Sequence, residues 1–141
     1  MAATTGRLSG LSSPPGKVLI VEDEAIIALD LQFRLAAMGL VVCDTVDTGQ
    51  LAIDRTRVHR PNLVLMDYKL RGPLTGLDAA LAIRAAREVP IIFLTGHRHT
   101  IPTAVLEELG ARLLCKPFRA AQLSSAVREA LGGMKERADF S

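Results

Sequence analysis

The sequence has no long apolar run, and this excludes two classes of protein. No run approaches the ~20 apolar residues that a helix needs to span a bilayer. The N-terminus also lacks the long apolar stretch of a signal peptide. We therefore expect a soluble protein that is neither exported nor inserted into a membrane.

Cysteine is scarce as well. The two cysteines, Cys43 and Cys115, each lie inside an apolar run. This setting is typical of small core residues in a reducing compartment, rather than of a disulfide pair or a metal site. The cysteines therefore favour a cytoplasmic location.

Net charge is low. The 17 basic and 15 acidic residues leave a formal charge of +2, and the basic residues are scattered instead of forming a stripe. A sequence pI of about 8.8 is by itself weak evidence for nucleic-acid binding, so we interpret the charges as a solvated surface and expect no nucleic-acid partner. The 141 residues, 49% of them hydrophobic, suit one compact domain, which must then hold the whole function.

Short apolar runs alternate with longer amphipathic stretches from residue 17 onward. The runs are nearly continuous in Val, Ile and Leu, which is typical of parallel strands that are covered on both faces. We expect strands at residues 18–21, 40–43, 63–66, 91–94 and 113–115. Residues 1–16 are rich in Ser, Thr, Gly, Ala and Pro, and we expect a flexible leader there.

Helical periodicity and capping residues place a helix after each strand. Signals such as the N-cap candidates Thr48 and Thr75, Pro102 in a first turn and the stop residue Gly110 mark the ends. We expect helices at residues 24–38, 48–58, 77–87, 102–110 and 120–131. The alternation predicts an α/β fold, a doubly wound five-stranded parallel sheet with helices on both faces. The polar tail at residues 132–141 is expected to fray, with no output domain.

Chemically reactive side chains follow four of the five predicted strands. They are Glu22 and Asp23, Asp67, Thr95, and Lys116. Because binding sites in open α/β sheets gather beyond the carboxyl ends of the strands, these residues should converge at one edge. Three crowded carboxylates repel one another, and a bound divalent cation stabilises such a cluster. Ligands that are all oxygen favour Mg2+.

This set of residues suits phosphoryl transfer. A carboxylate can attack phosphorus to form an acyl phosphate, and the reaction needs positive charge and hydrogen-bond donors around the phosphoryl oxygens. Lys116 supplies a mobile ammonium and Thr95 a hydroxyl, and Gly96 leaves space beside them.

Four motifs resemble those of a response-regulator receiver domain of the CheY-like superfamily. They are VLIVEDE at residues 18–24, LVLMD at 63–67, IFLTG at 92–96 and KPF at 116–118. The resemblance covers residues 17–131, and the four motifs are specific as a set although each alone is weak. It implies a flavodoxin-like receiver fold with strand order 2-1-3-4-5.

The resemblance also implies a role for each site residue. Asp67 is the phosphoacceptor, and Glu22 and Asp23 hold Mg2+ together with it. The carbonyl of Lys69 completes the protein ligands. Thr95 and Lys116 contact the phosphoryl group, and the peptide bond from Lys116 to Pro117 is often cis in the family.

The implied function is that of a stand-alone response regulator. It receives the phosphoryl group from a sensor histidine kinase or a histidine phosphotransfer protein, and it acts on a downstream protein by contact, as a relay or as a phosphate sink. Such a protein catalyses only its own phosphorylation and dephosphorylation and is not otherwise an enzyme. It is a monomer or a phosphorylation-dependent dimer.

Three positions depart from the common receiver pattern. Leu113 stands where receivers that switch by an aromatic rotation have Tyr or Phe, so Thr95 must signal through other packing. Gly96 replaces the common Ala, and residues 93–96 resemble a Phe-x-Thr-Gly subgroup found in alphaproteobacterial stress and relay systems. Lys69 and His97 lie at positions that tune phosphoryl lifetime by family analogy.

Other interpretations remain open at this stage. Asp23 or Glu24 could cap the next helix, and His97 and His99 could be exposed loop residues with no metal. Phe118 is expected to pack and Tyr68 to make a loop contact, and neither is evidence for stacking on bases.

Alternative functions also remain. A non-phosphorylated pseudo-receiver that serves as a protein-binding module would explain the missing aromatic at Leu113. A DNA-binding regulator has only the pI in its favour, because no helix-turn-helix remains outside the receiver. Aspartyl-phosphate phosphatases carry a D-x-D pattern after the strand, whereas Asp67 is followed by Tyr68 and Lys69.

Overall fold

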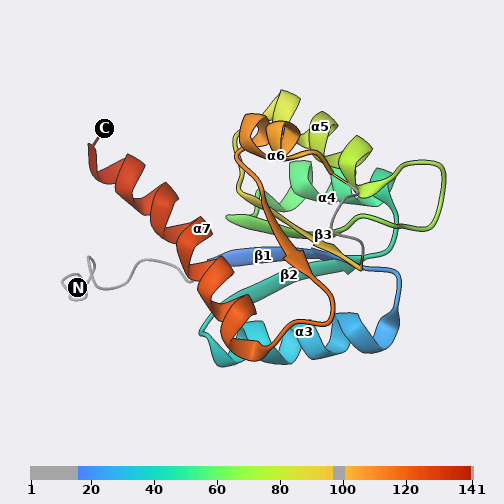
Figure 1. Cartoon of the computed structure of the whole chain (residues 1–141), viewed down its shortest axis with the longest axis horizontal. Helices are drawn as coiled ribbons and strands as arrows, with labels where there is room; N and C mark the ends of the chain where they lie inside the picture. Colours follow the sequence, from blue (N-terminus) through green and yellow to red (C-terminus); the bar gives the residue numbers. More distant parts are fainter. Residues whose placement is uncertain (1–15, 97–100, 141) are drawn as a thin grey trace.

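The computed structural model of the chain describes residues 16–96 and 101–140. Its five strands form one parallel sheet in the order β2-β1-β3-β4-β5 (Figure 1), which confirms the predicted fold and strand order. The strands are β1 (Lys17–Val21), β2 (Val41–Val46), β3 (Leu63–Asp67), β4 (Ile91–Thr95) and β5 (Arg112–Cys115). The helices described between and after them are α3 (Ala25–Ala37), α4 (Gly49–His59), α5 (Gly76–Ala86), α6 (Thr103–Leu109) and α7 (Ala120–Phe140).

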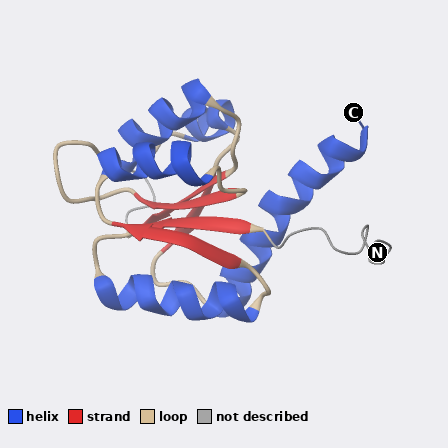
Figure 2. Cartoon of the chain, turned by 180° about the vertical axis from the view of Figure 1, so that it is seen from behind, coloured by secondary structure: helices blue, strands red, loops and turns tan. Residues whose placement is uncertain are grey.

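Helices cover both faces of the sheet. In the front and back views, α4, α5 and α6 lie on one face, and α3 with the first part of α7 lies on the other (Figures 1 and 2). Successive side chains of a strand point in opposite directions, so each central strand supplies both cores. Leu19, Val64 and Phe93 pack toward α4, α5 and α6, while Ile20 and Leu65 pack toward α3 and α7.

The helix ends largely follow the capping signals of the sequence. The Oγ1 of Thr48 accepts a hydrogen bond from the N–H of Leu51 at 3.0 Å and so caps α4. Thr75 and Asp78 form a capping box at the start of α5. Gly110 ends α6 with a φ of 63°, a left-handed conformation that glycine adopts without strain.

Two elements are longer than the sequence predicted. β2 continues past Cys43 to Val46, because this edge strand is only partly buried and so tolerates the polar Asp44 and Thr45. The expectation that α7 ends at Leu131 is wrong, since the helix continues to Phe140. Gly132 does not have a positive φ and therefore does not act as a helix stop.

The remaining predictions concern the N-terminal leader, two histidines, the two cysteines and membrane-spanning helices. Apart from Gly16, the leader predicted at residues 1–16 lies outside the described residues, and so do His97 and His99. Cys43 and Cys115 are both free thiols, as predicted. No helix in the described ranges has both the length and the apolar character needed to cross a membrane.

Candidate functional site

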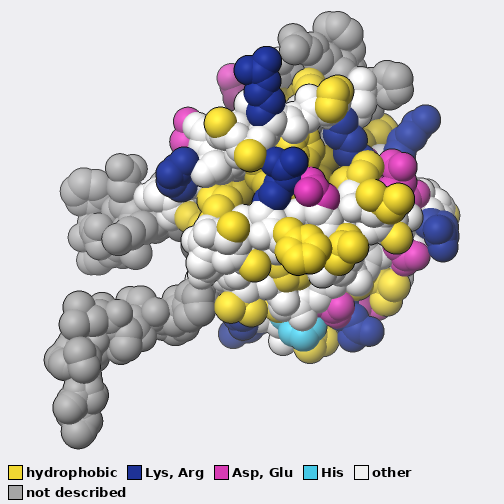
Figure 3. Space-filling model, turned by 90° about the horizontal axis from the view of Figure 1, so that it is seen from below, with side chains coloured by type: hydrophobic (Ala, Val, Ile, Leu, Met, Phe, Trp, Pro, Cys, Tyr) yellow, Lys and Arg dark blue, Asp and Glu magenta, His cyan; other side chains and the backbone are white. Residues whose placement is uncertain are grey.

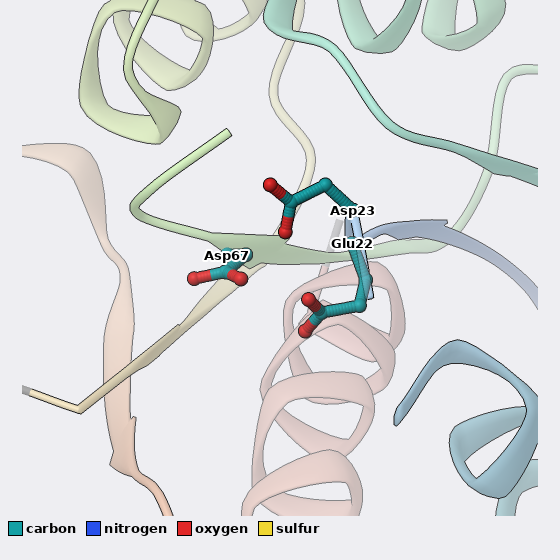
Figure 4. Close-up of side chains that lie close together, drawn as sticks. All are labelled: Glu22, Asp23 and Asp67. Carbon is teal, nitrogen blue, oxygen red and sulfur yellow. The ribbon is translucent and has the colours of Figure 1, made fainter. Parts of the chain in front are cut away.

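Three carboxylates meet at the carboxyl edge of the sheet. Glu22 and Asp23 directly follow β1, and Asp67 is the last residue of the neighbouring strand β3. One carboxylate oxygen from each of the three lies within 4.8 Å of the others. Figure 4 shows the three side chains gathered around one small space. The predicted convergence of these acids is therefore present in the fold.

Lys116, which follows the edge strand β5, contacts two of the acids. Its Nζ lies 3.0 Å from Oε1 of Glu22 and 3.1 Å from Oδ2 of Asp67. The N–H of Lys116 donates to the carbonyl of Thr95 at 2.8 Å, which places it directly beside the end of β4. The Lys116–Pro117 peptide bond is cis, as the resemblance implied. One ammonium thus contacts two of the three carboxylates.

Backbone N–H groups hold the two carboxylates that Lys116 contacts. The N–H of Glu24 donates to Oε2 of Glu22 at 3.1 Å. The N–H of Lys69 donates to Oδ1 of Asp67 at 3.3 Å, so the connection after β3 touches the predicted phosphoacceptor directly. Each of these carboxylates therefore has one oxygen toward Lys116 and the other toward a backbone donor.

Burial makes the charges in this cluster costly. Glu22, Asp67 and Thr95 are buried, whereas Asp23 is only half-buried. Burial, together with a hydrogen bond to Asp67, raises the pKa of the Glu22 carboxyl from 4.5 to about 7, although the Lys116 ammonium acts in the opposite direction. Burial lowers the pKa of Lys116, but its hydrogen bonds to Glu22 and Asp67 more than offset this and the pKa is raised. The cluster is short of positive charge.

The site opens into a cavity of about 410 Å³. Its walls come from the ends of several strands, and they combine acids, a hydroxyl and an ammonium. The lining residues are Asp23, Glu24, Asp67, Tyr68, Lys69, Thr95, Gly96 and Lys116. Five of the six predicted site residues therefore line one space, and the sixth, Glu22, contacts it through Lys116.

Gly76 helps to position the site and was not predicted from the sequence. A Cβ at this position would lie 2.2 Å from the carbonyl oxygen of Asp67, a distance that no side chain tolerates. Its N–H donates to the carbonyl of Tyr68 at 2.7 Å. Only a glycine lets α5 start this close to the end of β3. The sequence signal for this was a glycine at a helix start, which is too common to identify a contact.

The connection between β3 and α5, residues 68–75, also docks on the turn before α4. Thr48 and Arg71 form an isolated parallel bridge, and Nη1 of Arg71 lies 3.4 Å from Oδ2 of Asp47. Leu74 packs so closely on Gly49 that a Cβ there would lie 2.8 Å from the Cβ of Leu74. No sequence pattern predicted this contact.

Comparison with known proteins matches this arrangement. Residues 18–128 match the model of the response regulator receiver domain. The transcriptional regulatory protein PdtaR of Mycobacterium tuberculosis H37Rv is 35% identical over 123 residues, which cover 86% of this chain and 60% of PdtaR. The phyllosphere-induced regulator PhyR of Methylorubrum extorquens is 34% identical over 116 residues, covering 82% of this chain and 43% of PhyR. The chain thus spans about 60% or less of the length of these relatives.

Solved structures agree in fold. The signal receiver domain of a modulated diguanylate cyclase from Desulfovibrio desulfuricans G20 superposes with a TM-score of 0.78 at 29% identity, covering 88% of this chain and 99% of that one. The receiver domain of PhyR from Erythrobacter litoralis gives a TM-score of 0.70 at 28% identity, covering 83% and 90%. The match runs from β1 into α7 and includes the acidic cluster at the carboxyl edge of the sheet. The chain belongs to the response regulator receiver domain family.

Proposed function

We propose that this chain is a response regulator receiver that accepts a phosphoryl group on Asp67 in the presence of Mg2+. The observation that carries the proposal is the contact of Lys116 with both Glu22 and Asp67, beside a third carboxylate within 4.8 Å. Three acids and one ammonium leave two negative charges in a largely buried site, which a divalent cation would neutralise. This balance argues against a merely structural ion pair.

The residues present fit Mg2+. Glu22, Asp23 and Asp67 offer carboxylate oxygens from two adjacent strand ends, and the backbone carbonyl of Lys69 is the proposed fourth oxygen. Mg2+ prefers such a small number of oxygen ligands, with water and phosphoryl oxygens in the remaining positions. When bound, the cation would offset the charge of Asp67 and of the incoming phosphoryl group.

The side chains then have separate roles in the transfer. An oxygen of Asp67 forms the new bond to phosphorus while the bond from phosphorus to the donor breaks, and the donor group leaves with the electron pair. Lys116 balances charge on the phosphoryl oxygens, and the hydroxyl of Thr95 donates a hydrogen bond to one of them. The N–H of Lys69, which donates a hydrogen bond to Asp67, holds the phosphoacceptor side chain in place.

The exposed face of α3 supports a protein donor, a histidine kinase or a histidine phosphotransfer protein in the cytoplasm. Ile26, Leu29 and Phe33 recur along α3 with 84%, 52% and 68% of their surface exposed, and Figure 3 shows hydrophobic side chains gathered on this side. Phe118 lies beside Ile26 and next to the Lys116–Pro117 bond. A partner helix that covers this stripe would lie next to the site.

Phe33→Asp should slow transfer from such a partner and leave labelling by a small phosphodonor unchanged.

Output in this proposal passes through apolar packing rather than through an aromatic rotation. Leu113 on β5 is paired in register with Phe93 of β4 and packs against the same core as Val105 and Leu106 of α6. A phosphoryl group held by Thr95 at the end of β4 would shift the population of α6, β5 and α7 positions, because it can bias only the elements it touches. The sequence of residues 93–96 favours the Phe-x-Thr-Gly subgroup.

The proposal is tested by intact mass after incubation with a small phosphodonor, with and without Mg2+. We expect the wild type to gain one phosphoryl group only with Mg2+, and Asp67→Asn to gain none. Equal labelling of Asp67→Asn would remove Asp67 from the mechanism. A folded wild type that binds no Mg2+ and gains no mass would favour the pseudo-receiver, a protein-binding module without chemistry.

A further inference from the structure

We propose that Arg71 is a positioning residue for the cation site, acting through its pair with Asp47. This inference rests on the proposed function, since the cation in question is the Mg2+ that the acidic cluster would hold. Arg71 lies two residues after Lys69, in the connection from β3 to α5. Neither Arg71 nor Asp47 was among the site residues predicted from the sequence.

One side of the connection is fastened to the site itself. The N–H of Tyr68 donates to the carbonyl of Leu94 at 3.1 Å, and the carbonyl of Tyr68 accepts from Gly76 at 2.7 Å. The N–H of Lys69 donates to Asp67. These bonds fix residue 68 and the end of the connection, but the placement of the Lys69 carbonyl depends also on where residues 70–75 run.

The other side is fastened to the turn that joins β2 to α4. Nη1 of Arg71 lies 3.4 Å from Oδ2 of Asp47, and the backbones of Arg71 and Thr48 form a parallel bridge. Gly72 has a φ of 89°, which turns the chain back immediately after this contact. The middle of the connection is therefore set by residues 47–49.

The same turn also holds Glu22, the acidic residue that follows β1. The N–H of Glu22 donates to the carbonyl of Val46 at 2.9 Å, one residue before Asp47. The turn at residues 46–49 thus contacts both halves of the cation site: Glu22 on one side and the connection that carries Lys69 on the other. A shift of Arg71 away from Asp47 would change the position of the Lys69 carbonyl relative to Glu22 and Asp23.

The charge of Arg71 allows a positioning effect to be distinguished from direct electrostatic repulsion of the cation. Arg71 and Asp23 line the same cavity of about 760 Å³, so the guanidinium also repels a cation bound at the acids. If Arg71 acted through space alone, its neutralisation would raise Mg2+ affinity. If it positions the connection, neutralisation lowers Mg2+ affinity in spite of the lost repulsion.

Tyr68 provides the readout for this test. It is the single tyrosine of a chain without tryptophan, and it lines the site cavity, so its fluorescence should report Mg2+ binding to the intact protein. We expect Arg71→Gln to weaken Mg2+ binding by about two- to fivefold, the range of an exposed ion pair. Arg57→Gln is the matched control, because Arg57 is more exposed and pairs only distantly, at 4.0 Å, with Asp54. The control should bind Mg2+ like the wild type.

Two further variants decide the mechanism. The charge swap Asp47→Arg with Arg71→Asp should restore affinity relative to Arg71→Asp alone. Gly49→Ala, which changes no charge but displaces Leu74, should also weaken Mg2+ binding. Unchanged or tighter binding by Arg71→Gln would overturn the inference. A wild type that gives no Mg2+ response in fluorescence or calorimetry would instead overturn the proposed function itself.

Discussion

At the scale of single residues, Glu22 shows why the acidic cluster is both unfavourable and useful. Its side chain is fully buried, and the carboxylates of Asp23 and Asp67 lie close to it. Without a cation, the protein lowers this cost by raising the pKa of Glu22 to about 7. A site in which burial and crowded carboxylates raise the pKa of Glu22 is one that gains free energy when a cation binds and neutralises those carboxylates.

This balance predicts a pH dependence that Glu22→Gln removes. The pKa of Glu22 in the folded protein lies above its ordinary value of 4.5, so the folded state takes up this proton first as pH falls. The contribution of Glu22 to the free energy of unfolding therefore increases as pH falls from above 7 toward 4.5. Glu22→Gln should make the metal-free protein more stable than the wild type at pH 8, with a smaller difference at pH 5.

Urea unfolding in EDTA at both pH values measures this effect. The same variant should bind Mg2+ about tenfold or more weakly, since even outer partners of metal ligands contribute that much. A wild type and a variant with the same pH dependence would show that Glu22 does not carry the raised pKa.

At the scale of elements, the site depends on how closely α5 follows β3. Gly76 begins the helix against the carbonyl of Asp67, and the connection between them folds back over Thr48 and Gly49. Strand ends and helix starts at this edge are therefore coupled by close backbone contacts as well as by the Arg71–Asp47 ion pair. A single added methyl group is enough to disturb them.

Gly76→Ala tests this close approach. The added Cβ would lie 2.2 Å from the backbone of Asp67, so α5 or the end of β3 must move. We expect a loss of about 1–3 kcal/mol in the free energy of unfolding, as for other overpacked sites. Gly96→Ala is the control, because a Cβ there would meet nothing within 4 Å, and it should change stability by less than about 0.5 kcal/mol. Equal effects of the two substitutions would contradict the steric account.

The elements themselves could mostly be predicted from the sequence. Apolar runs located the central strands within about a residue, and Thr48 and Gly110 marked helix ends, because these signals are local. The end of β2 was not predicted, since an edge strand buries fewer apolar residues. The length of α7 was not predicted, because residues 132–141 begin with two glycines and are mostly polar. The docking of Arg71 on Asp47 joins residues far apart in the chain and leaves no periodic pattern.

At the scale of the whole molecule, the doubly wound sheet brings distant residues to one edge. Glu22 and Lys116 are 94 residues apart in sequence and 3.0 Å apart in space. Strand order 2-1-3-4-5 places β1, β3 and β4 side by side, so the acids, Asp67 and Thr95 come from adjacent strands. The convergence could be predicted from the order of the motifs, whereas the distances and the burial required the fold.

The central claim is that Asp67 becomes an acyl phosphate, and reductive trapping tests it most directly. Borohydride reduces an acyl phosphate to an alcohol with loss of phosphate, so a phosphorylated aspartate becomes homoserine. The protein is incubated with a phosphodonor and Mg2+, reduced, and mapped by peptide mass spectrometry. We expect homoserine at position 67 and at no other aspartate, and none when Mg2+ is omitted. Homoserine at another position, or a phosphoryl group that resists reduction, would contradict it.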